Sequence, residues 1–243
     1  MVAKNVQQED TLISFRFFHT YIEISHIHGI ESWRKQDSEE RSQSDWLAHL
    51  LSIFNKPIIQ QLEIGTINHI IYLDAIKNLI TKCKILKICE NCSDDLAKIA
   101  VIKLSAITLE KVETYKNRFV SGNYISDILT YNLKSLHLNN SMNQYEVNFE
   151  DLLSANIRRL SVHTAIITDK ELNQFVQVWM KSSDKFYRLQ RVYLSVSKEL
   201  SRKEILRGIR YKNVDNKQRV NRDDMKELIM DIGLKYLILE FPR

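Results

Sequence analysis

The sequence predicts an α/β fold: a leucine-rich-repeat-like solenoid in which short strands and helices alternate and the strands form a parallel curved sheet. A short apolar pattern recurs at a nearly constant interval, and amphipathic stretches fill most of the gaps between its copies. The 243 residues include only five Gly and two Pro, which is little material for many tight turns. This scarcity disfavours an all-β sandwich and favours helices joined by short polar connections.

The recurring pattern is an apolar residue, two variable residues, an apolar residue, one variable residue, and an apolar or small residue. Copies begin at residues 59, 83, 109, 133 and 157, and looser copies begin at 189 and 234. The central apolar residues are Leu62, Leu86, Val112, Leu136, Leu160, Val192 and Leu237. Their spacings are 24, 26, 24 and 24 residues, followed by 32 and 45. Each copy alternates apolar and polar residues, so we predict a short, half-buried strand at each.

The first part of the chain differs from the rest. Residues 12–24 alternate in the manner of strands, with a break in the middle. Residues 31–44 are almost wholly polar, which predicts a flexible connection or an exposed loop. Residues 45–54 form an amphipathic pattern that predicts a helix at the N-terminal end of the solenoid. We therefore predict an N-terminal segment over residues 1–45 and a repeat domain over residues 46–243.

Helix signals lie between the predicted strands, over residues 67–80, 93–104, 148–153 and from 168 onward. Ser93 or Asp94 is a plausible N-cap for the second of these. Thr168 and Glu171 have the spacing of a capping box, in which each side chain satisfies a free backbone N–H group of the other. The helix that follows carries four large apolar residues on one face: Leu172, Phe175, Val176 and Trp179.

Sequence patterns of catalysis are missing. The chain has no Gly-rich phosphate loop, nucleophile elbow, His-Glu-x-x-His or second Cys-x-x-Cys pair. Cys83, Cys89 and Cys92 indicate a reducing compartment, and we interpret them as small residues beside a strand rather than zinc ligands. His26 and His28 are interpreted as exposed strand residues. We expect no enzymatic activity, no cofactor and no metal.

The charge balance is mildly basic, with a net charge of +5 and a sequence pI near 9.0. The densest basic stretch, residues 198–212, is interpreted as a solvated helix face, with an acidic partner as the alternative. No stretch has the composition of a secretory leader or the ~20 apolar residues of a membrane span. We expect a soluble protein of the cytoplasm or nucleus without a membrane partner.

The strand register predicts a binding face. If the central apolar residues point into the core, the residues before and after each of them point the other way. Glu63 is predicted to face outward by the same rule. Arg and Tyr, which are favoured at interfaces, gather in the later strands. The partner-binding candidates are Ser135, His137, Arg159, Ser161, His163, Arg191 and Tyr193.

Two neighbouring patterns carry a family resemblance: a "DLL…N" segment and a "T-x-x-x-L-N-x-F-x-x-x-W" helix. The residues that fill them are Asp151, Leu152, Leu153, Asn156, Thr168, Leu172, Asn173, Phe175 and Trp179. Both resemble the nematode type 2 F-box-associated family, over about residues 46–212 and best over 133–196. The resemblance implies a domain that selects protein substrates for a ubiquitin ligase.

Residues 1–45 depart from that family, because they contain neither the Leu-Pro start nor the helices of an F-box. Direct docking to the Skp adaptor of a cullin–RING ligase is therefore in doubt. Three hypotheses remain: a substrate-recognition domain, a stand-alone protein-binding domain without ligase recruitment, and, ranked last, a nucleic-acid binder. In the first two the partner is a protein whose identity the sequence does not reveal.

Overall fold

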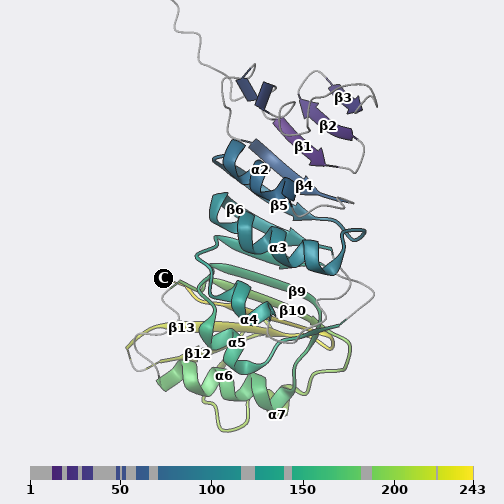
Figure 1. Cartoon of the computed structure of the whole chain (residues 1–243). Helices are drawn as coiled ribbons and strands as arrows, with labels where there is room; N and C mark the ends of the chain where they lie inside the picture. The colour runs from purple at the N-terminus through teal and green to yellow at the C-terminus, as the bar shows by residue number, and fades with distance from the viewer. Residues whose placement is uncertain are drawn as a thin grey trace, which may run out of the picture. The chain divides into compact units, whose positions relative to one another are not determined.

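A computed structural model describes residues 13–17, 21–26, 29–34, 48–49, 51–52, 59–65, 71–115, 124–139, 144–181, 188–222 and 224–242. The chain divides into two compact units, Met1–Leu109 and Glu110–Arg243, which are considered separately below. Each unit combines strands with helices (Figure 1), so the predicted α/β class is confirmed.

The first unit contains β1 (Ile13–Phe17), β2 (Tyr21–His26), β3 (Gly29–Arg34), β4 (Ile59–Ile64), α2 (Ile71–Leu79), β5 (Cys83–Ile88), α3 (Asp94–Leu104) and a 3₁₀ turn, η1 (Ser105–Ile107). Strands β1, β2 and β3 pair antiparallel, whereas β1 pairs parallel with β4 and β4 pairs parallel with β5. The predicted polar loop is wrong at residues 31–34, which belong to β3. Their backbone groups pair with β2, and that ladder forms although the side chains are polar.

The helices of the first unit lie close to their predicted places. Helix α3 begins directly after Ser93, whose Oγ accepts a hydrogen bond from the Leu96 N–H at 3.3 Å, so Ser93 is the N-cap. Residues 66–70 and most of the predicted helix over 45–54 lie outside the described residues; residues 48–49 and 51–52 are helical.

The interior of the first unit contains a polar side chain that the alternation of residues along a strand predicts to be exposed. Leu62 and Leu86 are opposite each other in β4 and β5 and fully buried, as predicted. Glu63, predicted to face outward, is only 5% exposed. The Cys89 thiol donates a hydrogen bond to it at 2.8 Å and Lys87 Nζ lies 3.4 Å from it, so partners satisfy the carboxylate inside the protein. Cys83 and Cys92 are buried.

Most of strand β6 (Thr108–Thr114) belongs to the second unit, because the boundary falls after Leu109. The elements that follow are α4 (Tyr124–Leu129), β7 (Ser135–Leu138), β8 (Tyr145–Glu146), α5 (Phe149–Ser154), β9 (Arg159–Ile166), α6 (Asp169–Lys181), β10 (Arg191–Val196), α7 (Arg202–Ile205), β11 (Lys212–Val214), β12 (Lys217–Asn221), β13 (Glu227–Ile232) and β14 (Tyr236–Glu240). Strands β6, β7, β9 and β10 pair parallel in that order, and the short β8 pairs with the end of β9. Helices α4 to α7 follow one another along these strands (Figure 1).

The predicted central residues of four copies meet in a single row across the parallel strands. Val112 is opposite Leu136, Leu136 opposite Leu160, and Leu160 opposite Val192. All four are at most 2% exposed. Burying a side chain of this size stabilises the fold by ~1.5–3 kcal/mol, so the row is a major part of the core. The predicted apolar face of α6 is buried as well: Leu172, Phe175, Val176 and Trp179.

Polar side chains fix the ends of the helices. Asn148 and Asp151 form a capping box at the start of α5. The predicted box at the start of α6 is confirmed, since the Thr168 N–H donates to Glu171 at 2.8 Å and the Glu171 N–H donates to Thr168 Oγ1 at 3.2 Å. The Asn173 amide donates to the carbonyls of Ile205 and Arg207, both at 2.8 Å, and so connects α6 to the end of α7.

The C-terminal part of the second unit differs from the prediction. Strand β14, which contains the looser copy's central residue Leu237, pairs antiparallel with β10, so the expected parallel arrangement is wrong there. Strands β11 to β14 form an antiparallel meander. The basic side chains of residues 198–212 are exposed, as predicted. However, only the four residues of α7 in this stretch are helical. Ser201 caps that short helix, and the chain then turns into β11.

The meander is joined to α6 by a buried arginine. Arg222 is 6% exposed, its guanidinium lies 5.3 Å from the Trp179 ring centroid, and it forms an ion pair with Asp224. The Phe241 ring lies 6.0 Å from that of Trp179 and 6.4 Å from that of Phe175. The Arg222 hydrogen bonds hold the pKa of Asp224 at about 2. The signature tryptophan thus lies between the helices and the C-terminal strands.

Replacing Asn173 with Ala should destabilise the second unit by about 1–2 kcal/mol, because the partly buried carbonyl of Ile205 and the exposed carbonyl of Arg207 both lose their donor. Urea unfolding would measure this, with Trp33 and Trp46 changed to Phe so that Trp179 fluorescence reports on this unit. The matched control is Gln174→Ala, since Gln174 is the exposed neighbour on the same helix. Equal midpoints for the two variants would contradict the role of Asn173.

Candidate binding site

Two rows of side chains lie on the face of the parallel strands opposite the buried apolar row. The first row runs through Lys111, Ser135, Arg159 and Arg191, which are register partners on adjacent strands. The second runs through Glu113, His137, Ser161 and Tyr193 in the same way. The rows form because these residues flank the buried row, and side chains alternate between the faces of a strand about 4.8 Å from its neighbour.

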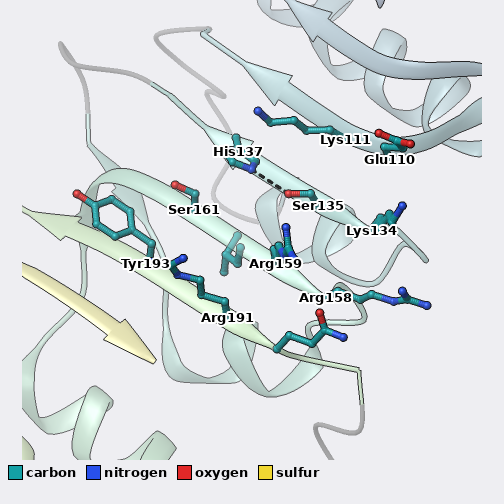
Figure 2. A pocket seen from close by; sticks show the side chains of 12 residues that line it. Glu110, Lys111, Lys134, Ser135, His137, Arg158, Arg159, Ser161, Arg191 and Tyr193 are labelled. Carbon is teal, nitrogen blue, oxygen red and sulfur yellow. Dashed lines mark hydrogen bonds between the residues drawn. The ribbon is translucent and has the colours of Figure 1, made fainter. Parts of the chain in front are cut away.

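These rows border a hollow of about 670 Å³, here called the strand groove. Six of the seven partner-binding candidates line it: Ser135, His137, Arg159, Ser161, Arg191 and Tyr193. Figure 2 shows Ser135, Arg159 and Arg191 following one another across three adjacent strands. The seventh candidate, His163, does not line the groove, but its ring is tilted against that of Tyr193 with 5.4 Å between centroids.

The groove has a second set of lining residues that the candidate list does not contain: Glu110, Lys111, Lys134, Arg158, Leu160 and Gln190. Lys134, Arg158 and Gln190 each precede the first row by one residue. The Arg159 N–H donates to the Lys134 carbonyl at 3.2 Å, and the Gln190 N–H donates to that of Arg158 at 2.7 Å. The register therefore continues one residue beyond the strands, and extending it backward would have identified these three.

Most of the charged residues that line the groove are cations: Lys111, Lys134, Arg158, Arg159 and Arg191, against the single carboxylate of Glu110. Lys111 forms an ion pair with Glu113, and Arg191 Nε lies 3.8 Å from Glu240. The other three cations, Lys134, Arg158 and Arg159, are exposed and have no ion pair within the part of the chain that the structure describes. The groove is thus a positively charged surface whose cations are only partly neutralised.

His137 is half-buried in the lining of the groove, and a hydrogen bond of 2.8 Å joins its Nε2 to Ser135 Oγ. Burial lowers the pKa of His137 to about 4, the nearby Lys111 lowers it further, and Glu113 opposes both. The ring is therefore neutral at pH 7. The positive charge of the groove at that pH belongs to lysine and arginine, and His137 is available as a neutral hydrogen-bonding group.

The sequence also directed attention to two other groups, His26 with His28 and the basic stretch over residues 198–212. His28 lies outside the described residues, and nothing in the described chain bears on a site with His26. The cations of residues 198–212 are exposed away from the lining of the groove, and Arg202 donates to the Ile232 carbonyl at 3.0 Å. Within the described residues, no helix is both long and apolar enough to cross a membrane.

Comparison with known proteins identifies one relationship. Residues 124–194 match the family model described as F-box associated. No curated protein and no solved structure matches the chain. The matched stretch contains the "DLL…N" segment, the α6 signature and three of the four groove strands, β7, β9 and β10. The resemblance to F-box associated domains is confirmed over this stretch.

Replacing His137 with Gln should flatten the pH dependence of stability between about pH 6.5 and pH 4. In that window the unfolded chain binds a proton at His137, whose ordinary pKa is 6.5, while the folded protein does not until about pH 4. The native state therefore loses stability as the pH falls, and the variant should lose less. Urea unfolding at pH 7, 5.5 and 4.5 would measure this, with His163→Gln as control. Parallel pH profiles for the wild type and His137→Gln would contradict the assignment.

Proposed function

We propose that this chain is a substrate-recognition domain of the F-box type, which binds a protein partner through the strand groove rather than catalysing a reaction. The observation that carries the proposal is the convergence of six candidate side chains, from three strands, on one open hollow. The match to F-box associated domains supports a role in protein recognition. A neutral His137, exposed cations and a half-buried Tyr193 give the hollow the mixture of groups found in protein interfaces.

The proposal includes a repeat architecture of the leucine-rich type. The in-register pairing of Val112, Leu136, Leu160 and Val192 supports it, since each copy buries its apolar residue against the next. Strand faces of such repeats are common binding surfaces. In this interpretation β11 to β14 are an addition that closes the C-terminal end of the repeats.

The proposed biological context is substrate selection for a ubiquitin ligase in the cytoplasm or nucleus. The family match supports this context. The alternative is a protein-binding domain that does not recruit a ligase, and it is motivated by residues 1–45, which contain no F-box pattern. Mixing the purified chain with the Skp adaptor and measuring binding by calorimetry separates the two: the alternative predicts no complex, and a clear complex would refute it.

The groove is tested by affinity capture with the double variant Arg159→Ala/Tyr193→Ala. We expect the variant to retain each specifically captured partner in an amount at least about tenfold lower than the wild type does. The reason is that interface Arg and Tyr residues commonly contribute about 1–2 kcal/mol or more each to binding. The readout is quantitative mass spectrometry of proteins retained by the tagged full chain.

The matched control for this experiment is Arg207→Ala/Tyr211→Ala. It also removes one arginine and one tyrosine, both exposed and both outside the groove. Capture should be unchanged in this control. Equal recovery by the groove variant and the wild type, with both folded by circular dichroism, would show that the groove is not the binding surface.

A further inference from the structure

We infer that the strand groove binds an acidic peptide segment, whose carboxylates contact the cations at the first row and at the strand starts. The inference rests on the proposed function and adds the chemical class of the partner. It starts from charge: of the five cations in the lining, the two at the sides of the groove have carboxylate partners from the chain itself.

The remaining cations, Lys134, Arg158 and Arg159, lie close together. Ser135 and Arg159 are register partners, and the backbone bond from Arg159 to the Lys134 carbonyl places Lys134 and Arg158 next to each other at the starts of β7 and β9. Side chains on adjacent strands are separated by about 5 Å. Neighbouring acidic residues of one peptide can therefore reach two of these cations at the same time.

The three cations have no ion-pair partner among the described residues that would offset their mutual repulsion. Like charges this close repel each other, and within the described residues no carboxylate of the chain pairs with them. A bound carboxylate would relieve that repulsion and form charge-assisted hydrogen bonds with a guanidinium. The three exposed cations are thus suited to binding an anion, and Arg191 and Lys111 extend this surface only weakly because they are already paired.

The second row indicates what lies beside the acidic residues. Ser161, Tyr193 and the neutral His137 offer hydrogen bonds and ring surface. A side chain with apolar or aromatic character suits this half of the groove. The expected ligand is a short extended segment that places carboxylates on Arg159 and its neighbours and a less polar residue against Tyr193.

A peptide is favoured over a nucleic acid by the carboxylates around the groove. Glu110 lines it, and Glu113 and Glu240 lie beside the first row. These carboxylates would repel a continuous phosphate backbone. A peptide carries negative charge only on its acidic side chains, which can lie away from the carboxylates. The face of Tyr193 is also partly occupied by His163, which reduces the ring surface available for base stacking.

The test is fluorescence anisotropy of the full chain with three probes: a labelled peptide of alternating Glu and Ser about ten residues long, its Gln–Ser counterpart, and a single-stranded oligothymidine of equal charge. We expect the Glu–Ser peptide to bind at least about tenfold more tightly than either of the others. Its affinity should fall as salt is raised, because the pairs lie at the surface.

Charge reversal locates the site. Arg159→Glu and Arg158→Glu should each weaken the Glu–Ser peptide at least about tenfold, whereas Arg207→Glu, the same change at an exposed position outside the groove, should change it less than about twofold. Two groove variants are made so that a folding defect in one leaves the other informative.

Four outcomes would overturn the inference: no binding of the acidic peptide, equal binding of the Gln–Ser peptide, tighter binding of the oligothymidine, or equal weakening by the groove and control reversals. Each is distinct from failure of the proposed function. If captured partners still depend on Arg159 and Tyr193 while the acidic peptide does not bind, the groove is a recognition surface for another chemistry. If the groove variant captures partners as well as the wild type does, the proposed function fails.

Discussion

The buried row through Val112, Leu136, Leu160 and Val192 is the constraint on which the second unit depends. Each residue contacts its equivalent on the next strand, and the helices cover the row from one side. A slip of one residue in any strand would exchange its apolar and polar faces, burying an arginine or serine and exposing a leucine or valine. The same row therefore fixes the core and the composition of the groove on the opposite face.

The residues that identify the family have structural roles in this fold. Asp151 caps α5, and Thr168 caps α6. Asn173 connects α6 to α7, and Trp179 packs beneath Arg222 and Phe241. None of them lines the groove. A family signature of this kind predicts the arrangement of helices and strands, whereas the residues proposed to contact a partner, such as Arg159 and Tyr193, lie outside the signature.

The sequence predicted what depends on local spacing and missed what depends on long-range pairing. The central residues, helix caps and six groove residues follow from a repeat of about 24 residues. The meander was missed because its first two strands, β11 and β12, are mostly polar, with Gln218 in β12 and Arg222 just after it buried where alternation predicts apolar residues. The scarcity of glycine predicts few tight turns, but a tight hairpin connects β11 and β12. Asp215 and Asn216 adopt φ of 50° and 64° there, a conformation that short polar side chains tolerate.

This unpredicted part of the fold also sets the charge of the groove. Strand β14 pairs with β10, and its Glu240 lies opposite Arg191 and within 3.8 Å of it. Lys217 of β12 lies 3.7 Å from the same carboxylate and so shares it. Arg159, one strand further from the meander, receives no such partner among the described residues. The C-terminal strands thus partly neutralise one side of the groove and leave its most available positive charge at Arg159 and the neighbouring strand starts, so the parallel strands and the meander together determine the distribution of charge along the groove.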